Sequence, residues 1–311
     1  MPFLVRWSRL RTFALAAAYA ASPLFALQLP SPSLEPAPRF ESTANEVTHI
    51  FTVLDRKGRP VTGLESKDFS VSDDGILVEE LKGFTQQSET PLHIAVAIDL
   101  SGSVHGRVKY EIDLSTKFLQ RVIRPTDDGW IIGFNFLQYP VADWTQAHDT
   151  LMAVARRYPG AGTAFYDTVL LACKHLATSG GNSHRRDVLI VISDGEDNAS
   201  RSGFGETLQT VSRSGVIVLV VYTGNSSPSR ELRTLAESTG GEFFYASTKR
   251  GVLNGLARAE QAIRGQYLIA YRPASFAQDG RFRSVHIRSL REGLKVRCRR
   301  GYYASSPVLT K

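Results

Sequence analysis

The sequence predicts an α/β protein in which a doubly wound, mostly parallel sheet is inserted between two segments of β-strands. The central residues, about 91–265, alternate short apolar runs with helical periods, which is the pattern of strands and covering helices. The flanks, about 41–90 and 266–304, contain strand patterns and turn signals but no long helical period. A third observation is that a carboxylate and two hydroxyls directly follow the apolar run Ile94–Ile98, at the kind of strand end where such sheets bind ligands.

Four near-continuous apolar runs in the central region predict strands that are buried on both faces. These runs are Ile94–Ile98, Gly129–Phe136, Val188–Ser193 and Val216–Tyr222. Tyr139–Trp144 follows Phe136 after two residues, so we expect an antiparallel edge strand there. Helices are expected over residues of about 107–122, 163–178, 205–214, 229–239 and 251–264. This alternation indicates a doubly wound domain.

The two flanks carry the signals of an antiparallel module. On the N-terminal side, Thr48–Leu54 and Phe69–Ser72 are strand-like, and the Asp73-Asp74-Gly75 that follows is a hairpin turn signal. On the C-terminal side, turns separate three further strands, which are Gln266–Tyr271, Phe282–Ser289 and Leu294–Arg299. We expect residues 266–304 to pair with residues 41–90 in a small β-sandwich-like module that carries the α/β domain as an insertion.

Residues 1–26 have the composition of a secretory signal peptide. Arg6, Arg9 and Arg11 form a charged start, a short Ala-rich apolar stretch follows, and small residues mark cleavage sites near residues 20 and 26. Prolines between residues 27 and 40 predict an extended linker, and residues 305–311 form a tail. We therefore expect the protein to be secreted or periplasmic. Contact with a membrane is expected only if the leader stays uncleaved and anchors the chain in the envelope.

The charge of the chain argues against a nucleic-acid partner. The formal net charge of +7 falls to +4 when the three arginines of the leader are removed, which is only mildly basic. Arginines are numerous near the C-terminus, but Lys295, Arg297 and Arg299 alternate with apolar residues, as on the solvated face of a strand. Interleaved aromatic residues are too few for a base-stacking platform.

The two cysteines predict core thiols. Cys173 lies in an apolar helical run, and Cys298 lies on the apolar side of an alternating strand. Export would permit a disulfide between them, but cysteines in apolar surroundings usually act as small hydrophobic residues.

Polar residues gather where three predicted pieces of the central region begin or end. Asp99, Ser101 and Ser103 follow the first apolar run on alternate residues, so an extended backbone points their side chains the same way. Thr163 opens a predicted helix, and Asp194 ends the third apolar run. The carboxyl ends of strands are where open α/β sheets bind ligands. Oxygen-only donors suit a hard divalent cation such as Mg²⁺.

These pieces resemble the metal-ion-dependent adhesion site of von Willebrand factor A domains, over roughly residues 91–265. All five positions of the family's metal site are filled. The resemblance implies that Ser101 and Ser103 ligate the metal through their hydroxyls. It also implies that Thr163 adds a third hydroxyl, directly or through water, and that Asp99 and Asp194 act mostly through waters. The sixth position would be open to a carboxylate from a partner protein.

The flanks extend the resemblance to nearly the whole mature chain. The stretch 58–64, the acidic turn at residues 73–75 and the closing residues 300–304 are similar to an exported family of von Willebrand A-related proteins that is abundant in Acidobacteria. The resemblance implies no defined biological role.

Elementary coordination chemistry supports a binding function. Hydroxyl ligands neutralise little of the ion's charge, so the metal favours an anionic ligand. We therefore expect a metal-dependent protein-binding module, not an enzyme, whose partner offers an Asp or Glu carboxylate to Mg²⁺, or to Mn²⁺ or Ca²⁺. A metal-dependent hydrolase is the alternative, but it needs a positioned general base near Ser101 and Ser103, and neither a G-x-S-x-G nor an H-E-x-x-H pattern occurs. A structural role, in which the metal only holds loops together, also stays open.

Overall fold

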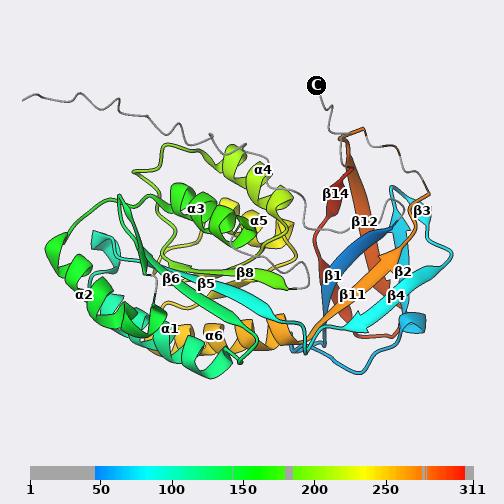
Figure 1. The fold of residues 1–311 in the computed structure, drawn as a ribbon, viewed down its shortest axis with the longest axis horizontal. Coiled ribbons are helices and arrows are strands. Elements are labelled where there is room, and N and C mark those ends of the chain that lie inside the picture. Colours follow the sequence, from blue (N-terminus) through cyan, green and yellow to red (C-terminus); the bar gives the residue numbers. More distant parts are fainter. Residues whose placement is uncertain (1–45, 142, 179–184, 275–276, 278, 305–311) are drawn as a thin grey trace, which may run out of the picture. The chain divides into compact units, whose positions relative to one another are not determined.

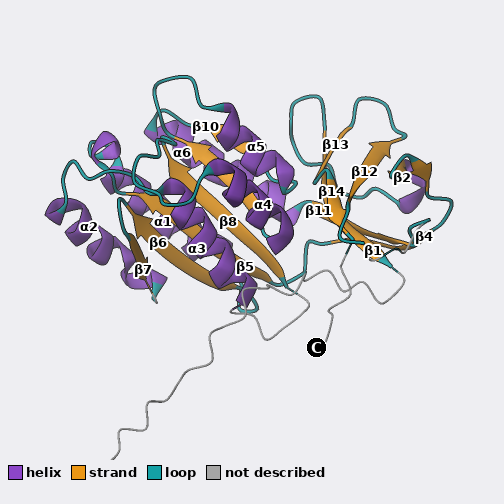
Figure 2. Cartoon of the chain, turned by 90° about the horizontal axis from the view of Figure 1, so that it is seen from above, coloured by secondary structure: helices purple, strands orange, loops and turns teal. Residues whose placement is uncertain are grey.

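The computed structural model describes residues 46–141, 143–178, 185–274, 277 and 279–304. Within them, a six-stranded mixed sheet with helices lies in sequence between the strands of two antiparallel four-stranded sheets (Figures 1 and 2). The predicted fold class is thereby confirmed. The expected leader, linker and tail lie outside the described residues. Among the helices of the described part, none is long and apolar enough to cross a membrane.

The central sheet is parallel except at one edge. Its strands in spatial order are β10 (Phe243–Tyr245), β9 (Ile217–Tyr222), β8 (Arg186–Ser193), β5 (Leu92–Asp99), β6 (Asp128–Phe134) and β7 (Gln138–Val141). The antiparallel strand β7 pairs with β6, which confirms the expected edge strand, but β7 ends at Val141 and Trp144 begins the 3-10 helix η3 (Trp144–Gln146). All residues of β5, β8 and β9 are buried, which explains why their sequences are almost continuously apolar.

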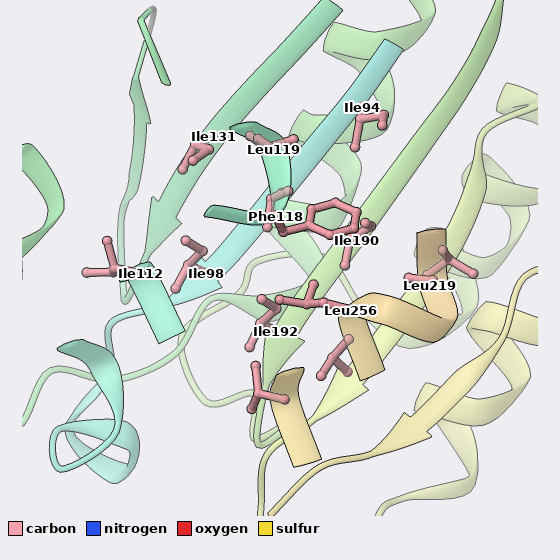
Figure 3. Packing of buried hydrophobic residues seen from close by; sticks show 14 of the residues in the cluster. Ile94, Ile98, Ile112, Phe118, Leu119, Ile131, Ile190, Ile192, Leu219 and Leu256 are labelled. Carbon is pink, nitrogen blue, oxygen red and sulfur yellow. The ribbon is translucent and has the colours of Figure 1, made fainter. Parts of the chain in front are cut away.

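Helices cover both faces of this sheet (Figure 1). The helices on one face are α1 (Val108–Val122), α2 (Ala147–Arg157) and α6 (Lys249–Arg264). Those on the other face are α3 (Phe165–Thr178), α4 (Phe204–Ser214) and α5 (Arg230–Ser238). Figure 3 shows Ile112, Phe118 and Leu256 of the first group packed with Ile98 and Ile190 of the sheet. Full burial of one such side chain contributes roughly 1.5–3 kcal/mol to the free energy of folding. The helices on both faces therefore stabilise the strands whose ends carry the site.

Two elements of the α/β domain were not expected from the sequence. Helix α2 buries only Ala147, Leu151 and Ala155. These residues form a narrow apolar face, so the helical period of the sequence is weak there. Strand β10 has three residues, fewer than a pattern needs to be recognised. Helix α3 begins at Phe165 rather than at residue 163, so Thr163 lies in the preceding loop.

The flanking strands form two sheets around a common core. One sheet has the order β13 (Lys295–Cys298), β1 (Val47–Leu54), β11 (Gln266–Tyr271) and β4 (Leu81–Gln86). The other has the order β14 (Gly301–Tyr303), β12 (Phe282–Ser289), β2 (Phe69–Asp73) and β3 (Ile76–Leu77). Strands from the two ends of the chain alternate in the first sheet, where β1 pairs with β11 and β13. In the second sheet they meet once, where β2 pairs with β12. Asp74 and Gly75, with φ of 48° and 82°, form the two-residue hairpin loop between β2 and β3.

The C-terminal arginines depart from the expected solvated face at one position. β13 ends at Cys298, and the following Arg299 is only 9% exposed. Burial lowers the pKa of Arg299 to about 10, and the nearby Tyr271 opposes this shift. Both cysteines are free thiols; Cys173 is buried and Cys298 is half-buried.

Candidate metal centre

The carboxyl end of β5 leads directly into the candidate site. β5 ends at Asp99, and Ser101 is the N-cap of the short 3-10 helix η2 (Gly102–Val104), which contains Ser103. The backbone N–H of Ser101 donates to Asp99 Oδ1 over 2.9 Å, and the Oγ atoms of Ser101 and Ser103 lie 3.1 Å apart. Asp99 and Ser101 are buried, whereas Ser103 is exposed. The turn thus brings a buried carboxylate and two hydroxyls together at the strand end.

The adjacent strand β8 places Asp194 beside this turn. The hydroxyl of Ser193 donates to Asp99 Oδ2 over 2.6 Å and accepts the N–H of Gly195 over 2.9 Å. Both oxygens of Asp99 therefore already accept hydrogen bonds from the protein. The Asp194 side chain is 8% exposed, and its buried Oδ1 has no hydrogen-bond partner among the described residues.

A third loop connects Thr163 to the other two. Thr163 is buried, and its N–H donates to Asn198 Oδ1 over 2.8 Å. Its carbonyl oxygen accepts the N–H groups of Asn198 and Ala199, both over 3.0 Å, in the loop that follows Asp194. On the other side, the N–H of Gly102 donates to the carbonyl oxygen of Ala161 over 3.0 Å. Backbone hydrogen bonds therefore hold all three predicted loops at one edge of the sheet.

Two charged residues that the sequence analysis missed lie beside Asp194. Arg107 Nη2 donates to Asp194 Oδ2 over 3.2 Å, and Arg107 Nε lies 3.6 Å from Oε1 of Glu111. Glu111 belongs to α1 and is fully buried, and within the described part of the chain neither of its carboxylate oxygens has a hydrogen-bond partner at normal distance. The Thr223 hydroxyl lies near enough to lower the pKa of Glu111. The spacing of four residues between Arg107 and Glu111 is the sequence signal that could have revealed this pair.

Burial dominates the electrostatics of the site. It raises the pKa of Glu111 to about 8, although the charge of Arg107 opposes the shift. It also raises the pKa of Asp99 to about 6, against the hydrogen bonds from Ser101 and Ser193. Carboxyl groups withheld from water favour their neutral form unless a positive charge lies nearby. Arg107 alone therefore does not hold the two buried carboxyl groups in their ionised form.

The donor set fits a hard cation. Hydroxyl and carboxylate oxygens are the ligands that Mg²⁺, Mn²⁺ and Ca²⁺ accept, and the unpaired Oδ1 of Asp194 is available to a bound ion or to its water. In the stretches that the structure describes, no group of three or more His, Cys, Asp and Glu side chains could hold a metal. The side-chain hydroxyls of Ser101, Ser103 and Thr163 are the further oxygen donors in the three loops.

The α/β domain also matches a known family in sequence. Residues 93–259 match the von Willebrand factor type A domain. The chain belongs to this family. Domains of the family generally mediate protein–protein interaction or adhesion, and proteins that contain them are typically not enzymes.

Individual relatives are similar over short or divergent regions. The mouse calcium-activated chloride channel regulator 3A-1 is 43% identical over 70 residues, which is 22% of this chain and 7% of that protein. The bovine calcium-activated chloride channel regulator 1 is 39% identical over 71 residues, 23% of this chain and again 7% of that protein. The chain thus matches about 7% of the length of these curated relatives.

Solved structures of similar domains show low identity. An aerotolerance-related membrane protein from Bacteroides fragilis is 16% identical with a TM-score of 0.41, over 54% of this chain and 98% of that one. The VWA domain of SpRpn10 is 12% identical with a TM-score of 0.43, over 55% of this chain and 97% of that one.

Proposed function

We propose that this chain is an exported, non-enzymatic protein-binding module that binds a carboxylate of its partner through a divalent cation. Asp99, Ser101, Ser103, Thr163 and Asp194 would hold the ion. The observation that carries this proposal is the convergence of three loops on oxygen donors, where the buried Oδ1 of Asp194 has no partner among the described residues.

The proposed roles of these residues follow from their contacts. Ser101 and Ser103 would supply neutral hydroxyl ligands, and Thr163 a third. Asp99, whose two oxygens accept hydrogen bonds from Ser101 and Ser193, would orient the turn and act on the ion through water. Neutral ligands leave the charge of Mg²⁺, or of Mn²⁺ or Ca²⁺, largely uncompensated, which favours an incoming Asp or Glu carboxylate.

The surface beside the site supports a protein as the partner. Phe136 and Leu137 are 41% and 49% exposed, although both are apolar. They directly follow Asn135, whose carbonyl oxygen accepts the N–H of Ala164 over 2.7 Å, next to Thr163. Phe136 packs edge to face on Tyr158, with ring centroids 5.8 Å apart. Aromatic residues are enriched at protein interfaces, so a carboxylate presented on a protein surface fits this environment better than a free anion.

The metal assignment is tested by isothermal titration of the purified protein with Mg²⁺ and Mn²⁺. Asp99→Ala should abolish binding and leave the far-UV circular dichroism unchanged. Asp149→Ala is the matched control, because its side chain is 99% exposed on α2 and it removes the same charge. Unchanged metal affinity in Asp99→Ala would remove the assignment.

The partner is sought by capture from an envelope extract in Mg²⁺ and in EDTA, with the captured proteins identified by mass spectrometry. Thr163→Ala should weaken partner binding more than metal binding, since Thr163 lies on the loop that faces the open position in the proposed arrangement. Loss of one anchor at the centre of an interface typically costs about 2 kcal/mol, which is roughly thirtyfold in affinity. Equal capture with and without metal would favour the structural role instead. Export is tested separately by fractionation, which should recover from the periplasm or medium a chain that starts near residue 21 or 27.

A further inference from the structure

Arg107 lies between two carboxylates with different roles. On one side it is hydrogen-bonded to Asp194, which belongs to the proposed metal site, and on the other it faces Glu111, which does not. The exposed fractions of the three side chains are 16% for Arg107, 8% for Asp194 and 0% for Glu111. A positive charge of the protein therefore already lies, shielded from water, where a cation is proposed to bind.

We propose that Arg107 competes with the metal for Asp194 and moves onto Glu111 when the metal binds. This inference rests on the proposed function, because it requires the metal site at Asp194. It assigns Glu111, which is not a proposed ligand, the role of receiving the guanidinium that the ion displaces. Arg107 and Glu111 are therefore positioning residues that set the metal affinity.

Electrostatic repulsion gives the reason for the movement. Coulomb energy grows with the product of the charges, so a divalent ion near Asp194 repels the Arg107 guanidinium strongly in a site with little water. The oxygens of Glu111 and the Nε of Arg107 lack hydrogen-bond partners at normal distance within the described residues. A guanidinium can form two parallel hydrogen bonds with a carboxylate, and Glu111 lies one helical turn from Arg107, within reach of such a pair. The displaced side chain therefore has a buried partner available.

The proposal predicts that the effects of Arg107→Gln and Glu111→Gln on Mg²⁺ affinity depend on each other, which the removal of two independent charges would not produce. Arg107→Gln removes the competitor, so Mg²⁺ should bind about tenfold more tightly, or about 1.4 kcal/mol. Glu111→Gln removes the receiving carboxylate, so Arg107 stays on Asp194 and Mg²⁺ should bind about tenfold more weakly. In the double variant the effect of Glu111→Gln should vanish, because no guanidinium remains to be received. Independent long-range charges would instead give additive changes.

The experiment is a double-mutant cycle of Mg²⁺ titrations on the purified protein at one ionic strength and at one pH above 8, where the Glu111 side chain is ionised. Arg156→Gln is the control, since it removes the same charge at an exposed position of α2 and should leave the affinity unchanged. Circular dichroism and thermal unfolding in EDTA check the fold of each variant. If Arg107→Gln does not fold, Arg107→Met, which keeps the volume without the charge, is expected to give the same tighter binding.

Two results would overturn the role of Arg107 and leave the metal site intact. One is Mg²⁺ binding that is no tighter in Arg107→Gln than in the wild type. The other is an equal weakening by Glu111→Gln with and without Arg107. Absence of Mg²⁺ binding by every variant, Arg107→Gln included, would overturn both this inference and the proposed metal site. Binding by Arg107→Gln but not by the wild type would support the competition strongly.

Discussion

Replacing Gly102 with alanine tests whether the loops of the site must touch for the metal to bind. Gly102 lies between Ser101 and Ser103, and its N–H bonds to Ala161 of the loop that leads to Thr163. A Cβ at this position would lie 2.5 Å from the Cα of Gly160 and 3.0 Å from its carbonyl carbon. Both of these atoms belong to the backbone, so no side-chain rotation can relieve the contact. The two loops would have to separate.

The magnitude follows from the overlap. Carbon atoms in contact normally lie about 3.5–4.0 Å apart, and overpacking of a closely packed region costs about 1–3 kcal/mol. If the metal-bound state requires the two loops in contact, this strain falls on metal binding. The Mg²⁺ affinity of Gly102→Ala should then fall by about fivefold to about 150-fold, although no proposed ligand is changed.

The assay is a Mg²⁺ titration together with urea unfolding in EDTA. Gly106→Ala is the matched control, because it makes the same substitution four residues away, where an added Cβ meets no atom within 4 Å. The control should retain wild-type affinity. If Gly102→Ala matches Gly106→Ala in both affinity and stability, the loops tolerate separation and the reasoning fails.

Two further predictions concern stability and the shared module. Burial raises the pKa of Glu111 to about 8, above its ordinary value of 4.5, so between these pH values the folded chain holds a proton that the unfolded chain has lost. The free energy of unfolding in EDTA should therefore fall as pH rises from 5 to 7, by up to about 1.4 kcal/mol per pH unit from this group. Glu111→Gln should lack this contribution. If urea unfolding gives parallel pH profiles for the wild type and the variant, the prediction is wrong. Truncation after Gly265 removes β11 and β13, which pair with β1, so in hydrogen exchange the amides of β1 should lose protection while those of β5 keep it. Persistent protection of β1 would mean that the N-terminal flank folds without the C-terminal one.

The sequence was most informative where burial is most complete. β5, β8 and β9 are buried along their whole length, so nearly every position must be apolar, and the pattern survives without any tertiary information. Helix α2 was missed because it buries only three small or medium-sized side chains on one face. Arg299 was placed on the wrong side because the alternation of β13 ends at Cys298. A two-residue period has no meaning after the strand has ended.

In the candidate site, too, residues close together in the sequence could be recognised, whereas contacts between distant residues could not. Asp99, Ser101 and Ser103 could be recognised together because one short turn contains them. Arg107 and Asp194 lie 87 residues apart, and no local pattern indicates that an arginine of the turn before α1 reaches the end of β8. Sequence reasoning therefore identified the proposed ligands but not Arg107, the arginine that contacts one of them.

If the proposed metal site is correct, the charges around Asp194 would favour a divalent ion over a monovalent one. Asp99, Asp194 and Glu111 interact electrostatically, and Arg107 is the cation in contact with two of them. When all three carboxylates are ionised, Arg107 leaves two negative charges uncompensated, and one divalent ion would restore neutrality. Buried charges are tolerated only when they are compensated in this way. Burial is the main cause of the raised pKa values of Glu111 and Asp99, and the neighbouring carboxylates add to it, so both groups favour a bound proton. An apolar residue in place of Glu111 would avoid the cost in stability of a buried carboxyl group. The guanidinium of Arg107 would then have no buried partner other than Asp194, a proposed metal ligand.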